Sequence, residues 1–286
     1  MFPLYDHNPH RRFPLVTILL IVANVWITWQ MALMPERRQV ELTFERGFIP
    51  LRLTRIDNPQ PLRIRQPLAP QPKRVPRRQR PQPQQPQQPP EVLELDLPSD
   101  SLSVYGTMLS TMFLHGGWLH LISNMWMLWV FGNNIEDRLG HIVFSLFYLA
   151  GGVIASLSHW AIDPESQLPV IGASGAVAAV LGAYALTFPW AKVRTLVFLG
   201  IPLLLDLPAF LVLGAWMLME TVAGIIQVHL GVAAGVAHWA HIGGFVAGLL
   251  LMPLLAIGRP PQGEDWNKET EKLFQYEDPK PLTERE

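Results

Sequence analysis

The chain has 286 residues, of which 49% are hydrophobic and only 16% are charged. Several uncharged runs approach or exceed the roughly 20 residues that a helix needs to cross a bilayer, so we expect a membrane protein and not a soluble domain. A formal net charge of −1 gives no support to nucleic-acid binding. The lack of cysteine excludes disulfides, thiolate metal sites and cysteine catalysis, which leaves serine, histidine and carboxylates for any chemistry. We expect no metal and no cofactor.

A positively charged N-terminus precedes the first apolar run. Residues 1–13 carry Arg11 and Arg12 directly before the apolar stretch 14–34. Such a long apolar run without a small-residue cleavage site predicts an uncleaved transmembrane helix and not a signal peptide. The two arginines place residues 1–13 in the cytoplasm by the positive-inside rule.

Residues 35–110 change in composition and are predicted to form an external loop after the first span. Within this loop, residues 59–90 are dominated by Pro, Gln and Arg and have no periodic apolar pattern. That composition predicts an extended or disordered insert. Long loops cross a membrane largely regardless of charge, although Arg37 and Arg38 beside the first span run against this orientation.

The core is predicted over residues 111–258, with a cytoplasmic tail at 259–286. Five further spans are expected, at about 118–135, 142–161, 170–188, 209–227 and 231–257. The stretch 195–208 is predicted to be a loop that dips toward the membrane, because two prolines and Asp206 interrupt its apolar pattern. The sequence therefore predicts an all-α bundle of six transmembrane helices with both termini in the cytoplasm.

The span at 170–188 contains a serine flanked by glycines, as Gly172, Ser174 and Gly175 near its start. The glycines permit close approach by another backbone and an unusual local geometry. Further small residues follow at helical spacing, so we expect a second helix to pack almost backbone to backbone here.

The last span offers the matching face. Gly244 and Gly248 form a GxxxG motif, and His241 lies about one turn ahead of it. Contact between the two glycine faces would bring His241 to the level of Ser174.

Polar groups at this depth have the residue types of a hydrolytic site. A serine hydroxyl needs a base to become a nucleophile, and His241 suits that role toward Ser174. His120 and Asn124, four residues apart on one helix face, can donate hydrogen bonds to an oxyanion, as can the Ser174 backbone N–H. No carboxylate is obviously placed to orient His241, which predicts a dyad, and for Glu220 we favour a structural or gating role over a catalytic one.

Each motif alone has a plainer interpretation. A GxSG in an apolar helix is usually a packing face, and a single membrane histidine is usually a satisfied polar contact. A His-x-x-x-Asn pair can equally hold two helices together. The chemical interpretation depends on their conjunction, since the predicted topology puts the starts of the second, fourth and sixth spans at one depth on the outer side.

A set of motifs covers most of the chain, namely NPHRRFP, FERGFIP, FLHGGWLHLISNMWMLWVFGNNIEDRLG, GASGAVAAVLGAY, FPWAKVRTLVF and AHIGGFVAGLLL. Together they resemble the rhomboid family of intramembrane serine proteases, in particular its bacterial members. The resemblance implies a six-helix fold with Ser174 as nucleophile and His241 as base. It also implies an oxyanion site at His120 and Asn124, and a structural role for His115.

The resemblance further makes the segment 136–138 structural and the fifth helix a lateral gate for substrates. It implies that transmembrane segments of other proteins are cleaved near the outer face, in the cytoplasmic (inner) membrane of a bacterium, with lipids as surroundings. Two features depart from the family pattern: the insert at 59–90, and His238, where relatives often have an aromatic residue.

Two alternatives stay open. One is a catalytically inactive rhomboid-like protein that binds transmembrane clients, and the other is a transporter, which is disfavoured because no pair of broken helices repeats. The sequence leaves open the physiological substrate, the oligomeric state, and the roles of the insert, His238 and Glu220.

Overall fold

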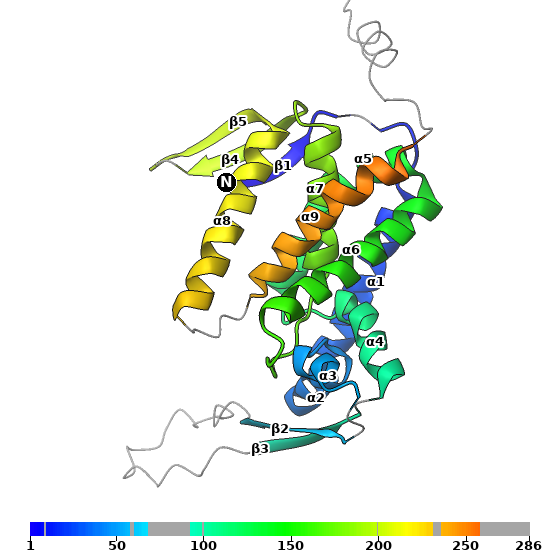
Figure 1. The fold of residues 1–286 in the computed structure, drawn as a ribbon. Helices are drawn as coiled ribbons and strands as arrows, with labels where there is room; N and C mark the ends of the chain where they lie inside the picture. Colours follow the sequence, from blue (N-terminus) through cyan, green and yellow to red (C-terminus); the bar gives the residue numbers. More distant parts are fainter. Residues whose placement is uncertain are drawn as a thin grey trace, which may run out of the picture.

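The computed structural model describes residues 1–8, 10–57, 60–67, 92–98, 100–198, 200–230 and 236–257. The predicted tail at 259–286 and most of the predicted insert lie outside the described residues. Helices dominate and pack as a bundle (Figure 1). The bundle consists of α1 (Leu15–Ala32), α5 (Trp118–Leu139), α6 (His141–Ile162), α7 (Ser174–Thr187), α8 (Ala209–Leu230) and α9 (His238–Leu255).

Apolar helices that face outward make the chain an integral membrane protein. Among the described residues, α1, α6, α8 and α9 are each long and apolar enough to cross a bilayer. Only 22% of the most apolar window is buried in α1 and in α8, so most of their apolar side chains face the surroundings, where lipid would accommodate them. The predicted all-α membrane fold is confirmed, since the described residues are mostly helical.

Two of the predicted spans begin later than the sequence indicated. Helix α7 begins at Ser174, because Val170 ahead of it is extended and pairs with the backbone of Phe48. Helix α9 begins at His238. Both helices therefore carry their polar residues in the first turn, and Ser174 is the first residue of α7, where backbone N–H groups lack intrahelical partners.

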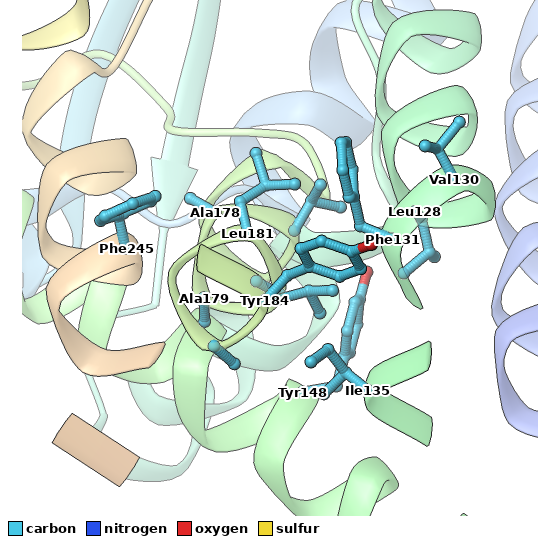
Figure 2. Packing of buried hydrophobic residues seen from close by; sticks show 14 of the residues in the cluster. Leu128, Val130, Phe131, Ile135, Tyr148, Ala178, Ala179, Leu181, Tyr184 and Phe245 are labelled. Atoms are coloured by element: carbon cyan, nitrogen blue, oxygen red, sulfur yellow. The ribbon is translucent and has the colours of Figure 1, made fainter. Parts of the chain in front are cut away.

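Helix α7 forms the centre of the bundle. Every residue from Gly175 to Tyr184 is buried, and α7 contacts α5, α6, α8 and α9. Figure 2 shows Tyr184 facing Phe131 of α5, with Phe245 of α9 on the opposite side; the Tyr184 and Phe131 rings meet edge to face at 4.9 Å. A helix enclosed on all sides gives a fixed position to the serine at its start.

Glycines set the spacing between α7 and α9. A Cβ atom at Gly248 would lie 1.9 Å from the carbonyl oxygen of Ala179, and one at Gly244 would lie 2.1 Å from that of Gly175. A Cβ at Gly182 of α7 would lie 2.0 Å from the carbonyl oxygen of Phe245. The two backbones are thus in direct contact, as the paired glycine faces predicted.

We expect Gly248→Val to unfold or inactivate the protein. Its side chain would overlap the backbone of α7, which cannot move aside as a flexible side chain can, and overpacking of this kind costs about 1–3 kcal/mol or more. Thermal unfolding in detergent should show a clear fall in the midpoint. Gly214→Val in α8 is the matched control, since a Cβ there meets nothing within 4 Å. Equal midpoints for the two variants would show that the backbone contact is not required.

Carboxylates from α5 hold the start of α1. Glu136, which is fully buried, accepts hydrogen bonds from the backbone N–H and the hydroxyl of Thr17 at 2.8 and 2.7 Å. Asp137 accepts from the backbone N–H groups of Arg11 and Arg12 at 3.1 and 3.0 Å. Negative charge at a helix N-terminus is favourable and satisfies its free donors. These contacts fasten α1 to α5, which supports the structural role expected for this segment.

The prediction of a loop over residues 195–208 is wrong. Strands β4 (Lys192–Phe198) and β5 (Pro202–Pro208) form an antiparallel hairpin, and β1 (Phe2–Asp6) pairs with the other edge of β4. The prolines that suggested an interruption are the first and last residues of an edge strand, where a missing N–H is tolerated. This sheet lies at the end of the bundle where α7 finishes (Figure 1).

The first loop contains more structure than predicted. It forms α2 (Glu36–Arg46), α3 (Pro50–Thr54), α4 (Ser101–Ser110), a 3₁₀ turn (Thr111–Phe113) and a hairpin of β2 (Leu62–Pro67) and β3 (Val92–Leu97). The prediction of a disordered insert over 59–90 is therefore wrong for its first part. Leu62 and Ile64 alternate along β2 and are buried in a cluster with Phe44 and Leu97. Residues 68–91 lie outside the described residues.

Candidate active site

The segment ahead of α7 is held in place by the first loop. The backbone of Val170 exchanges hydrogen bonds with Phe48, and the Gly172 N–H donates to the carbonyl oxygen of Thr111 at 3.0 Å. Gly172 has φ of +119°, and a Cβ there would lie 2.6 Å from Nε2 of His120. Only glycine suits both the backbone conformation and this close approach. The chain therefore delivers Ser174 at a fixed turn beside the His120 ring.

Ser174 and His241 lie in hydrogen-bond contact. His241 is in the first turn of α9, and its Nε2 is 2.8 Å from the hydroxyl oxygen of Ser174. Both groups are partly buried, so the pair is shielded yet still accessible. The contact follows from the packing of α9 on α7, because Gly244 lies one turn beyond His241 and touches Gly175, the residue after the serine.

A carboxylate contacts His241, contrary to the expectation from sequence. Glu220 of α8 has its Oε2 2.8 Å from Nδ1 of His241, on the opposite side of the ring from Ser174. The statement that no carboxylate is placed for this role is therefore wrong. One signal was available, since Glu220 is the only charged residue in the stretch that forms α8 and such residues usually mark a site. The spacing could not show it, because the contact joins two helices.

His238 shares the same carboxylate. Its Nδ1 also lies 2.8 Å from Oε2 of Glu220, and the three side chains of Glu220, His238 and His241 are 12–16% exposed. The ring of Trp216 lies beside His241, with centroids 6.1 Å apart. Helices α8 and α9 are thus joined by a cluster of one carboxylate and two imidazoles.

The expected oxyanion donors line the same cavity as the serine. A cavity of about 690 Å³ is lined by His120, Asn124, Ser174 and His241, among others. The Asn124 amide nitrogen donates to the His120 carbonyl oxygen at 3.1 Å, which leaves it a second N–H. The Ser174 backbone N–H belongs to the first residue of α7, where no intrahelical acceptor is available. The residues that carry these expected donors thus line the cavity that holds the serine.

His115 lies behind this wall and does not line the cavity. It is buried, its Nδ1 is 3.5 Å from the hydroxyl of Thr28, and its ring meets that of His120 edge to face at 5.0 Å. This ring contact and its burial are compatible with the structural role expected for His115.

Comparison with known proteins adds independent information. A family model described as "Rhomboid domain" matches residues 103–257. Rhomboid-like protein 11, a chloroplast protein of Arabidopsis thaliana, is 31% identical over 149 residues, or 50% of each chain. The mitochondrial Rhomboid protein 1 of Saccharomyces cerevisiae is 30% identical over 169 residues, or 56% of this chain and 43% of its own. The chain thus spans half or less of the length of these relatives.

The matched region bears on both the fold and the site. It runs from α4 through α9 and therefore includes the serine, both histidines of the cavity and Glu220. Since the family model covers more than half of the chain, the chain belongs to the rhomboid family.

Proposed function

We propose that this protein is an intramembrane serine endopeptidase that hydrolyses peptide bonds in or near transmembrane segments of membrane proteins. The observation that carries the proposal is the 2.8 Å contact between Ser174 Oγ and His241 Nε2 in a cavity inside an apolar bundle. A protein that only binds clients needs neither a base at that distance nor donors around the hydroxyl. Membership of the family is compatible with both functions, and the geometry of the site supports the protease.

The mechanism requires His241 to move a proton twice. Its Nε2 accepts the Ser174 proton while Oγ attacks the scissile carbonyl carbon, and it then returns the proton to the leaving amine. In the second half of the reaction, Nε2 accepts a proton from a water molecule that attacks the acyl-enzyme. It then returns this proton to Oγ, which releases the second product. Glu220 holds the Nδ1–H of His241, which keeps the Nε2 lone pair directed at the serine and stabilises the imidazolium that forms. We therefore propose a Ser-His-Glu arrangement in place of the simple dyad.

His120 and Asn124 are proposed to hold the oxyanion, together with the Ser174 backbone N–H. The tetrahedral intermediate carries negative charge on the former carbonyl oxygen, and fixed donors lower its energy most in a site of low dielectric constant. Gly172 is needed for this arrangement, because any side chain there would occupy the space taken by His120.

The substrate would reach this cavity from the bilayer. Its lining includes Trp216 and Glu220 of α8 as well as Met127 of α5, so the cavity lies beside α8, the helix that the family resemblance makes the lateral gate. The prediction of a bacterial membrane receives no support from the relatives above, which are named as chloroplast and mitochondrial proteins. The proposal concerns a membrane-embedded enzyme and does not depend on which membrane holds it.

A serine-reactive fluorophosphonate tests the proposal directly. We expect the detergent-solubilised protein to be labelled, and the label to be lost in Ser174→Ala and in His241→Ala. Ser123→Ala is the matched control, since Ser123 lines the same cavity but donates only to the carbonyl oxygen of His120 in its own helix. Absence of labelling in the folded wild type, or labelling that survives Ser174→Ala, would favour the client-binding alternative.

A further inference from the structure

The cluster behind His241 has the composition of a metal site. Glu220, His238 and His241 each offer one ligand atom, and these atoms all lie within 4.8 Å of one another. Within the part of the chain that the structure describes, this is the one group of at least three such side chains at that spacing. The three side chains are 12–16% exposed, and Glu220 and His241 line the cavity, through which an ion can reach them.

Two imidazoles and one carboxylate form a ligand set that zinc uses in proteins, with a further position open to water. Zinc bonds to nitrogen and oxygen at about 2.0–2.2 Å, which places neighbouring ligand atoms of a tetrahedral site about 3.3 Å apart. Each Nδ1 now lies 2.8 Å from Oε2 of Glu220, so each pair would open by about half an ångström to admit the ion.

We propose that Glu220, His238 and His241 bind a divalent transition-metal ion, zinc above all, and that the bound ion inactivates Ser174. The binding itself does not depend on the proposed protease activity, whereas the inhibition rests on it. An ion at Nδ1 of His241 takes the lone pair of that nitrogen. The neutral ring then carries its proton on Nε2, the atom that faces the serine hydroxyl.

Metal and catalysis are therefore mutually exclusive at His241. With a proton on Nδ1, held by Glu220, the Nε2 lone pair can accept the serine proton. With a metal on Nδ1, Nε2 presents an N–H, and Ser174 has no base. The position of His238 is decisive, because it contacts the carboxylate and not the serine, so it can contribute to metal binding without taking part in the reaction.

Metal binding can be measured without any activity. Full-length Ser174→Ala protein, freed of its affinity tag and of metal, is titrated with Co²⁺, whose visible absorption reports tetrahedral coordination, and Co²⁺ is then displaced by Zn²⁺. We expect saturation at one ion per chain. His238→Asn keeps a hydrogen-bond donor for Glu220 but removes an imidazole, and should weaken binding by more than about tenfold. His229→Ala is the control, since that exposed histidine bonds only within its own helix, to the Ile225 carbonyl oxygen.

Inhibition is measured on the wild type by fluorophosphonate labelling with and without Zn²⁺. We expect zinc to suppress labelling, EDTA to restore it, and His238→Asn to need a zinc concentration more than about tenfold higher for the same suppression as the wild type. Should His238→Asn fail to fold, as judged by thermal unfolding, His238→Ala replaces it. Absence of a saturable Co²⁺ spectrum, or one unchanged by loss of His238, would overturn the metal site. A wild type that is never labelled but binds Co²⁺ would instead contradict the proposed function and leave the site standing.

Discussion

Replacing either Ser174 or His241 with alanine is expected to abolish cleavage of a model transmembrane substrate while the protein stays folded. The hydroxyl oxygen and Nε2 are 2.8 Å apart and act on one proton, so neither residue is useful without the other. In serine hydrolases the loss of such a unit lowers kcat on the order of a millionfold. The measurement is the cleavage rate in proteoliposomes, with thermal unfolding as the check on folding.

The double variant tests whether Ser174 and His241 act as one unit. Residues that act as a unit are not additive, so Ser174→Ala combined with His241→Ala should be no slower than either single variant. A double variant much slower than both would mean that the two groups contribute independently, and the proposed proton transfer would then be wrong. Ser174→Ala removes one oxygen atom from the first turn of α7, so a large change in thermal stability is not expected.

The helical bundle and the juxtaposition of Ser174 and His241 could be predicted because both leave recognisable local patterns in the sequence. Apolar runs of membrane length define the spans, and the glycine faces around Gly175 and Gly244 show which two helices approach most closely. The position of His241 near Ser174 then follows from helical spacing, because His241 lies about one turn ahead of Gly244. A contact between helices is readable from sequence when both sides carry a recognisable motif.

The contact of Glu220 with two histidines could not be predicted from the sequence. A single carboxylate on α8 carries no face or spacing that points to a partner, and its two histidines lie on another helix. The hairpin of β4 and β5 shows a different failure. Its prolines are helix breakers, but on an edge strand they disturb no hydrogen bond, and only the pairing partner reveals that position. Both features depend on tertiary contacts that the local sequence does not encode.

Glu220→Gln is expected to lower kcat by about two to four orders of magnitude with little change in KM. Glutamine keeps the shape of the side chain, but its amide can donate to Nδ1 of His241 and so favour the tautomer with the proton on Nε2, facing Ser174. In a serine protease triad the corresponding change costs about 10⁴ in kcat, through the wrong tautomer. Loss of the charge also removes the partner of the imidazolium.

The matched control for Glu220→Gln is Thr221→Val, because the Thr221 hydroxyl donates only within α8, to Met217. Glu220→Asp should recover part of the rate, since it restores the charge at a shorter reach. Steady-state kcat and KM are measured for all three variants beside thermal unfolding. If Glu220 serves only to tie α8 to α9, Glu220→Gln should destabilise the protein and leave kcat unchanged, or raise it by freeing α8. A fall in kcat with unchanged stability and KM distinguishes a residue that orients the base from one that holds two helices together.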